Sequence, residues 1–472
     1  NTLIRCFSVC AEYNFDFTRT NLGGSLKRLA VSTLVVLIIL CSSVARCQDL
    51  APAAPEQVGM SSDRLARIDA FVERHLEAGH FAGAVTVVAR HGKVVQFEAF
   101  GMQNIEFEVP MTKNSIFRIY SMSKPITSVA VMILFEEGRF LLNDPVSRYL
   151  PEFNGIEVGV EEIDKTSGER VLKTVPANRE VTIRDLLRHT SGLSYGLWGD
   201  SLVDKMYLDR EVLMWKGTTI QDTVAKLAAI PLKQQPGTVW QYGLSTDVLG
   251  RFIEVVSGQP LDEFLERRIF SPLGMKDTGF FVPPEEAHRL TTVYTPNREN
   301  TAITPHDPES VNQYTYRTFT EEVSHFSGGG ELVSTAADYL RFTQMLLNGG
   351  ELDGVRILGP KTVELMTRNH LGDITMWDGA GGYGFGLGFM IYPDSGTSGD
   401  ILSEGSFAWG GMAHTGFFVD PEEELIGIFL TQILPEAPLP YSDLFVPVVY
   451  QAIVEGRCPY CRLIQSVSKP SH

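Results

Sequence analysis

The chain has 472 residues, of which 44% are hydrophobic and 10% aromatic, so it can bury a large core and form two or three domains' worth of structure. The formal net charge of −17 and the pI of about 5.1 disfavour nucleic acid and anionic membrane surfaces as partners. Solubility is the simplest explanation of this acidic balance.

The first 47 residues differ from the rest of the chain. Lys27 and Arg28 precede a short apolar run, 29–41, and small residues follow it. This order is typical of a secretory signal peptide, with cleavage expected at Ser43-Val44-Ala45. The alternative is an uncleaved membrane anchor, although the apolar run is shorter than the ~20 residues that span a bilayer. The sequence therefore predicts an exported protein, periplasmic or secreted, with no other contact with a membrane.

Two cysteines remain outside this segment, Cys458 and Cys461, and both lie in a predicted C-terminal tail, 457–472. In an exported protein their spacing favours a small disulfide loop, because a zinc or redox site would need partners that are missing nearby. We expect neither a metal nor a cofactor.

The mature chain opens with helical and then strand-like patterns. Apolar residues recur at helical spacing between Glu56 and Gly79, which predicts an opening helix. Two strand-like runs, 82–90 and 93–100, flank the turn signal His91-Gly92 and predict a hairpin. An extended segment, 107–120, then leads to the first motif.

That motif is Ser121-Met122-Ser123-Lys124-Pro125, at the start of a predicted helix with one buried apolar stripe. Lys124 shares a helical face with Ser121, so its amine can reach the hydroxyl. A lysine kept partly neutral by burial or by a second cation can remove the serine proton and create a nucleophile. The same pattern recurs at Ser466-Val467-Ser468-Lys469, where no helix follows, and we interpret that copy as tail.

Residues 151–325 show mainly helical patterns between long loops, which predicts a helical domain inserted into a sheet domain. Within it, Gly192-Leu193-Ser194-Tyr195-Gly196 matches Gly-x-Ser-x-Gly. The nucleophile elbow with that motif needs a strand before the serine, whereas a predicted helix, 181–188, precedes Ser194. We therefore interpret Ser194 as a chance match.

The final third returns to strand-like patterns and closes with a helix over 441–454. Because strands lie at both ends of the chain, we expect one sheet built from two parts, 56–150 and 326–456. The four predicted C-terminal strands cover 383–392, 405–411, 415–419 and 425–430.

A third group could complete the chemistry of Ser121 and Lys124. A proton shuttle to the leaving atom is needed, and a tyrosine can provide it when nearby cations lower its pKa. Tyr242 precedes an amphipathic helix that ends at Gly258, and it is the best candidate. The alternative for a lone tyrosine is a buried structural role.

Four ordered segments resemble the family VIII carboxylesterases, relatives of class C β-lactamases and D-alanyl-D-alanine carboxypeptidases. The resemblance covers about residues 56 to 456 and implies an α/β (α+β) fold of the serine β-lactamase and penicillin-binding-protein type. In that fold an antiparallel sheet is flanked by helices and carries a helical insertion. The segments are 117–127 around Ser121, Leu187-Arg188-His189-Thr190-Ser191-Gly192-Leu193, Tyr242 with Asp247-Val248-Leu249-Gly250, and Trp409-Gly410-Gly411.

The resemblance assigns roles to these residues. It implies that Ser121 is the acylated nucleophile and that Lys124 and Tyr242 are its activating and proton-relaying pair. The oxyanion hole would be the backbone N–H groups of Ser121 and Met412, which stabilise the charge of the tetrahedral intermediate. The residues implied in substrate binding are Trp409, Gly410, Gly411 and His414.

Departures from the β-lactamase pattern point to the substrate. Lactamases carry Tyr-x-Asn and Lys-Thr-Gly where this chain has Tyr242-Gly243-Leu244 and Trp409-Gly410-Gly411. A flat indole in place of a cationic anchor suits a neutral acyl or alcohol group. His414-Thr415-Gly416 is the alternative third motif, and we favour Trp409 because little strand remains beyond Gly416.

The sequence therefore predicts a serine esterase that cleaves a short-chain, small-molecule ester through an acyl-enzyme. A β-lactamase or a D-alanyl-D-alanine carboxypeptidase that uses the same residues is the nearest alternative. A non-catalytic binding protein of the same fold is an alternative of another class.

Overall fold

The computed structural model describes residues 50–197, 199–213, 217–307, 319–321, 323–434 and 439–456. The predicted signal peptide, the Cys458–Cys461 pair and the second Ser-x-x-Lys copy lie outside these residues. Clustering of contacts treats 49–472 as one unit and does not separate a sheet domain from a helical one. The predicted boundaries of the helical insertion, at residues 150 and 325, therefore stay a prediction. No helix in the described ranges has the length and apolar character needed to cross a membrane.

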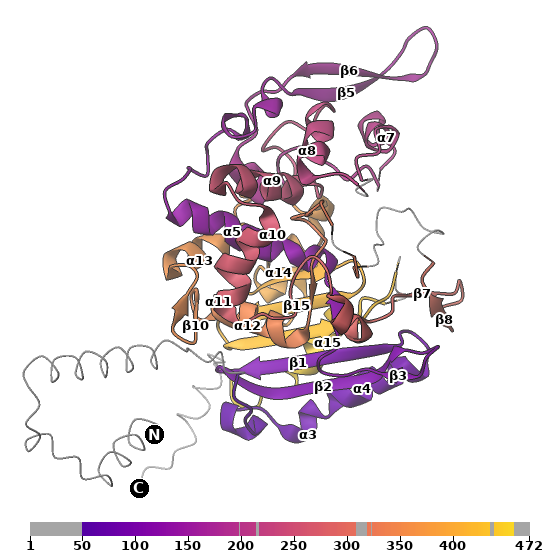
Figure 1. Cartoon of the computed structure of the whole chain (residues 1–472), viewed down its shortest axis with the longest axis vertical. Helices are drawn as coiled ribbons and strands as arrows, with labels where there is room; N and C mark the ends of the chain where they lie inside the picture. The colour runs from indigo at the N-terminus through magenta and orange to yellow at the C-terminus, as the bar shows by residue number, and fades with distance from the viewer. Residues whose placement is uncertain are drawn as a thin grey trace, which may run out of the picture. The chain divides into compact units, whose positions relative to one another are not determined.

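The centre of the unit is an eight-stranded sheet in the order β12-β13-β14-β15-β16-β1-β2-β3, in which every pair is antiparallel (Figure 1). Strands from the two ends of the chain meet where β1 pairs with β16, with Val87 opposite Ile428. This confirms the predicted antiparallel sheet. The strands are β12 (Gly384–Phe385), β13 (Met390–Ile391), β14 (Phe407–Gly411), β15 (Thr415–Asp420), β16 (Leu425–Leu430), β1 (Gly83–Arg90), β2 (Lys93–Asn104) and β3 (Val109–Pro110).

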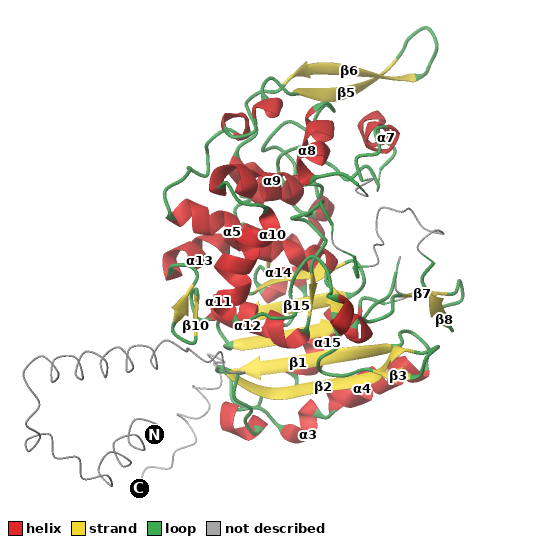
Figure 2. Ribbon diagram, viewed as in Figure 1, coloured by secondary structure: helices red, strands yellow, loops and turns green. Residues whose placement is uncertain are grey.

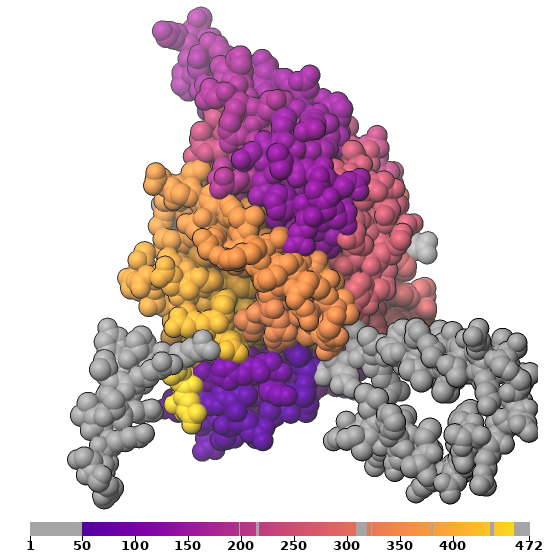
Figure 3. Space-filling view, turned by 90° about the vertical axis from the view of Figure 1, so that its left-hand side faces the viewer, coloured from indigo at the N-terminus to yellow at the C-terminus, as the bar shows by residue number. Residues whose placement is uncertain are grey.

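Helices cover both faces of the sheet, which explains why β1 and β16 are buried along their whole length. Helices α4 (Arg67–Glu77) and α15 (Tyr441–Tyr450) contribute apolar residues to the core on one face. On the other face α5 (Ser123–Glu136) and α12 (Ala336–Leu347) contribute to the larger core. In the space-filling view the indigo N-terminal part adjoins the yellow C-terminal part (Figure 3).

Helix α5 is the helix that the sequence predicts after Ser121. It is more deeply buried than predicted. Every residue from Ser123 to Leu134 is buried, instead of one stripe. The reason is that α5 lies between the sheet and helices α9 (Ser245–Ser257) and α10 (Leu261–Leu265), so no face of it meets solvent. Ser121 precedes this helix, in a 3₁₀ turn over Tyr120–Met122.

Three predicted segments have different boundaries in the structure. The mainly helical stretch also contains a hairpin of β5 (Glu157–Ile163) and β6 (Arg170–Pro176), which projects from the helices (Figure 2). Its strands are mostly exposed, so charged residues hide the alternation that marks a strand. The predicted strand 383–392 is two short strands, because Gly388 with φ 102° helps turn the chain back. The opening helix is split into α3 (Ser62–Leu65) and α4, after a 3₁₀ turn over Pro55–Val58.

Shorter elements complete the unit. The helices are α6 (Ile183–Leu187), α7 (Leu202–Asp209), α8 (Ile220–Ala228), α11 (Ser271–Leu273), α13 (Pro360–Met366) and α14 (Ser395–Ser398), with a π-helical turn over Glu266–Phe270. Further 3₁₀ turns cover Val146–Arg148, Pro151–Phe153, Pro284–Arg289 and Trp377–Gly382. The remaining strand pairs are β4 (Phe117–Arg118) with β9 (Val333–Ser334), β7 (Tyr294–Pro296) with β8 (Ile303–Pro305), and β10 (Glu351–Leu352) with β11 (Val355–Arg356).

Asp185 in α6 anchors the segment that follows this helix. Its buried carboxylate accepts hydrogen bonds from Arg179, Arg188 and the Thr190 hydroxyl, and it forms a capping box with Thr182. Burial would raise the pKa of Asp185, but the bonds from Arg179 and Thr182 outweigh it and lower the pKa from 3.8 to about 2. The carboxylate therefore stabilises the fold at neutral pH.

We expect Asp185→Asn to lower the free energy of unfolding by about 3 kcal/mol at pH 7, because two arginines lose their charged partner. Asp185 stabilises the folded state above its ordinary pKa, and this contribution is lost as the pH falls through the folded pKa of about 2. Urea unfolding at pH 7, 4 and 3 should therefore show that the difference between wild type and Asp185→Asn shrinks at the acidic end. A difference that stays constant would contradict this assignment.

Candidate active site

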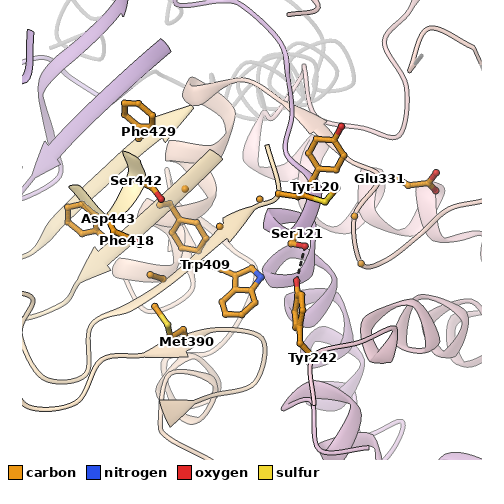
Figure 4. Close-up of a pocket in the computed structure, with 18 of the residues that line it drawn as sticks. Tyr120, Ser121, Tyr242, Glu331, Met390, Trp409, Phe418, Phe429, Ser442 and Asp443 are labelled. Atoms are coloured by element: carbon orange, nitrogen blue, oxygen red, sulfur yellow. Dashed lines mark hydrogen bonds between the residues drawn. The ribbon is translucent and has the colours of Figure 1, made fainter. Parts of the chain in front are cut away.

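A strained turn presents Ser121. Strand β4 pairs with β9 and leads to Tyr120, whose φ of 42° is left-handed. Such a conformation costs a non-glycine residue about 1–3 kcal/mol and persists only where neighbours enforce it. Here the Ile119 N–H donates to Leu332 O at 3.0 Å, and the Met122 N–H donates to Ile119 O at 3.0 Å. The turn directs the Ser121 hydroxyl toward Tyr242 at the cavity wall (Figure 4).

Lys124 lies one helical turn after Ser121, and its side chain is buried. Its Nζ is 3.0 Å from Ser121 Oγ, donates to Gly329 O at 2.6 Å and donates to the Tyr195 hydroxyl at 2.9 Å. A neutral amine has two N–H donors and one lone pair. With Gly329 O and Tyr195 accepting the two protons, the lone pair is free to face Ser121. The geometry suits a general base.

Tyr242 approaches the same hydroxyl from a third part of the chain. Its OH donates to Ser121 Oγ at 2.7 Å (Figure 4). The Trp240 indole stacks on the Tyr242 ring with centroids 5.9 Å apart and an 11° angle between planes, which fixes the ring. Lys124 Nζ lies 4.8 Å from the centroid of the Tyr242 ring, within the range of a cation–π contact. The structure therefore brings Ser121, Lys124 and Tyr242 together.

Asp247 is a buried carboxylate behind this group that sequence reasoning named but gave no role. It accepts a hydrogen bond from Ser327 Oγ, and that hydroxyl accepts one from the Gly329 N–H at 3.2 Å. A Cβ added to Gly329 would lie 2.5 Å from Asp247 Oδ2, so only glycine lets this loop lie against the carboxylate. Burial raises the pKa of Asp247, and the charge of Lys124 opposes that rise. Asp247 therefore fixes the loop that carries one acceptor of the Lys124 amine.

Ser121 and Tyr242 line a cavity of about 1420 Å³, and several aromatic rings stand beside them in its wall. Trp409 is buried in that wall, with ring centroids 5.5 Å from Tyr242 and 5.3 Å from Phe385. Trp377 is parallel to Trp409 within 6°, at 6.3 Å. In Figure 4 the indole nitrogen of Trp409 is turned toward the Ser121–Tyr242 pair. The wall presents flat apolar surfaces beside the hydroxyl of Ser121.

The two alternatives for the third motif lie on either side of one tight turn. Trp409, Gly410 and Gly411 end β14 and, with Met412, line the cavity. His414 lies in the turn itself with φ 61°, and its ring packs 6.0 Å from Tyr441. Burial there lowers the pKa of His414 to about 4. Among the described residues, His414 is absent from the cavity lining because the turn directs it to α15.

The Gly-x-Ser-x-Gly segment forms a buried turn. Ser194 Oγ donates to Asp204 Oδ1 at 2.7 Å and accepts the Gly196 N–H at 3.2 Å, so the hydroxyl is held within the turn. Asp204 is in turn paired with Lys233 at 2.7 Å. The next residue, Tyr195, lines the cavity and contacts Lys124, which no local pattern in the sequence indicates.

The chain is similar to known proteins in sequence and in fold. The family model described as Beta-lactamase matches residues 68–445. Protein Rv1367c of Mycobacterium tuberculosis is 35% identical over 76% of this chain and 88% of its own length. Esterase EstB of Burkholderia gladioli is 31% identical over 78% of this chain and 90% of its own length. The solved structure of EstCE1, described as a hydrolase with promiscuous acyltransferase activity, is 27% identical, covers 83% of this chain and 99% of its own, and has a TM-score of 0.67.

Proposed function

Because the chain belongs to the beta-lactamase family, we propose that it is a serine esterase that cleaves short-chain carboxylic esters through an acyl-enzyme on Ser121. One observation carries the proposal. Ser121 Oγ lies 3.0 Å from Lys124 Nζ and 2.7 Å from the Tyr242 hydroxyl, at the wall of a large cavity. The name of the relative EstB supports an esterase.

In the proposed acylation Lys124 accepts the hydroxyl proton of Ser121, whose Oγ attacks the ester carbonyl carbon. The carbonyl oxygen becomes an oxyanion, for which the N–H groups of Ser121 and Met412 are the proposed donors. The Tyr242 hydroxyl gives a proton to the alcohol oxygen as the carbon–oxygen bond breaks. Water then attacks the acyl-enzyme, and the same groups return the proton to Ser121.

The charge of the cavity wall supports a neutral substrate. The described residues that line the cavity include no lysine or arginine, and they include Trp409, which we favour as the counterpart of the lactamase lysine. β-Lactams and D-alanyl peptides carry a carboxylate, which a wall rich in carboxylates repels. The carboxylates in the lining are Asp247, Glu321, Glu331, Asp400 and Asp443.

The test compares two chromogenic substrates, p-nitrophenyl butyrate and a cephalosporin. We expect fast cleavage of the ester and slow or absent cleavage of the lactam by the purified protein. Preferential turnover of the cephalosporin would instead support the β-lactamase alternative. Absence of turnover, together with failure of an active-site phosphonate to label Ser121, would support a binding protein of the same fold. Detection of the protein outside the cytoplasm would test the proposed export.

A further inference from the structure

In the proposed acylation a proton must pass from Lys124 to Tyr242, and Ser121 cannot carry it. Lys124 takes up the serine proton, whereas Tyr242 must donate one to the leaving alcohol. Once Ser121 Oγ is bonded to the acyl carbon, it has no proton to pass between them. A proton that travels from Lys124 to Tyr242 therefore needs a route around Ser121.

Tyr195 provides such a route. Its hydroxyl accepts a hydrogen bond from Lys124 Nζ at 2.9 Å, and its ring lies beside that of Tyr242. The two tyrosine rings are 5.4 Å apart between centroids, and both residues line the cavity. Lys124 thus contacts both Ser121 and Tyr195, whereas Tyr242 bonds to Ser121 and lies against Tyr195, so the four side chains surround one point.

The Gly-x-Ser-x-Gly turn holds Tyr195 at this point. Ser194 is fixed by Asp204, and its N–H donates to the Tyr207 hydroxyl at 3.1 Å. The turn also lies directly against the backbone beside Tyr242. A Cβ added to Gly243 would be 2.4 Å from Leu193 O and 2.8 Å from backbone atoms of Ser194. Glycine at 243 therefore allows the two tyrosine-bearing segments to approach each other.

The surroundings of Tyr195 keep its hydroxyl protonated. Burial raises the pKa of Tyr195 well above its ordinary value, and the nearby Tyr242 and Asp247 raise it further. Once it has taken up the serine proton, Lys124 is the ammonium that contacts this hydroxyl. A phenol that stays neutral cannot act as a base, but it can accept one proton while it donates another.

We propose that Tyr195 relays the proton from Lys124 to Tyr242 during acylation. The Lys124 ammonium gives a proton to the Tyr195 oxygen, and the hydroxyl proton of Tyr195 passes to the Tyr242 oxygen. The hydroxyl proton of Tyr242 passes to the alcohol oxygen as its bond to the acyl carbon breaks. All three side chains end neutral, and the proton that the alcohol takes from Tyr242 balances the one that Ser121 gave to Lys124. The relay rests on the proposed esterase function.

Tyr195→Phe tests the relay through two esters with the same acyl group. Ethoxide must be protonated as it leaves, whereas p-nitrophenolate is a stable anion and needs little help. We expect kcat/KM to fall about 100-fold or more for ethyl butyrate but less than about 10-fold for p-nitrophenyl butyrate. The hydrolysis of ethyl butyrate is followed by pH titration, and that of p-nitrophenyl butyrate by absorbance.

Tyr207→Phe is the matched control. Tyr207 is buried and supports the same turn through Ser194, but it lies outside the cavity lining. Its loss loosens the turn without removing a relay group, so any decrease should be equal for the two esters. Equal losses in Tyr195→Phe, or no loss, would overturn the relay. A wild-type protein that is inactive on both esters would instead overturn the esterase proposal itself.

Discussion

Ester hydrolysis is expected to disappear when Ser121 is replaced with alanine. The acyl-enzyme cannot form without the hydroxyl, and loss of a nucleophile typically lowers kcat by about 10⁴-fold or more. Lys124 and Tyr242 would remain, but both act on the proton of a group that is gone. Hydrolysis of p-nitrophenyl butyrate by wild type and Ser121→Ala measures the effect.

Ser194→Ala is the control for this experiment, because Ser194 belongs to the second serine motif. Its hydroxyl bonds to Asp204 and Gly196 inside a buried turn. We expect this variant to lose less than about 10-fold in activity toward p-nitrophenyl butyrate, whose leaving group needs little help from Tyr195. It should lose about 1–3 kcal/mol of folding stability, since Asp204 loses a partner. Activity that survives in Ser121→Ala and is lost in Ser194→Ala would reverse the assignment of the nucleophile.

Lys124→Ala and Tyr242→Phe are each expected to lower kcat/KM at least ~100-fold, the usual scale for loss of a general acid or base. Tyr242→Phe keeps the ring that stacks on Trp240, so any decrease in kcat/KM measures the contribution of the hydroxyl alone. Lys233→Ala, which removes a cation paired with Asp204, serves as the matched lysine control. Rates near wild type in either site variant would exclude that residue from the chemistry.

The fold class could be predicted, and the structure brings the predicted residues Ser121, Lys124 and Tyr242 together, because the signals for them in the sequence are local. Ser121 and Lys124 share a helical turn, and Tyr242 immediately precedes a helix with a clear apolar stripe. The hairpin of β5 and β6 was not predicted, because its exposed strands carry charges that obscure a period of two. Boundaries also differ where a glycine such as Gly388 reverses the chain.

The outer part of the site could not be predicted because tertiary packing creates it. Tyr195 meets Lys124 only after a turn folds against Gly243, and nothing in the local sequence reports that contact. Likewise, Trp409 and His414 are five residues apart, and the direction of one turn decides which of them reaches the cavity. A sequence pattern therefore indicates which residue types form such a site more readily than it indicates where their side chains point.

The pairing of β1 with β16 has a consequence for synthesis and export. Val87 and Ile428 are neighbours in the sheet although most of the chain separates them. The proposed nucleophile comes from the first part of the chain, whereas Trp409 and Met412 come from the last part. A nascent or incompletely translocated chain therefore carries Ser121 without the other wall of its cavity. Under the proposed export and esterase function, the enzyme would gain activity only after the last strands have been delivered, and a chain still awaiting export would be inert toward esters.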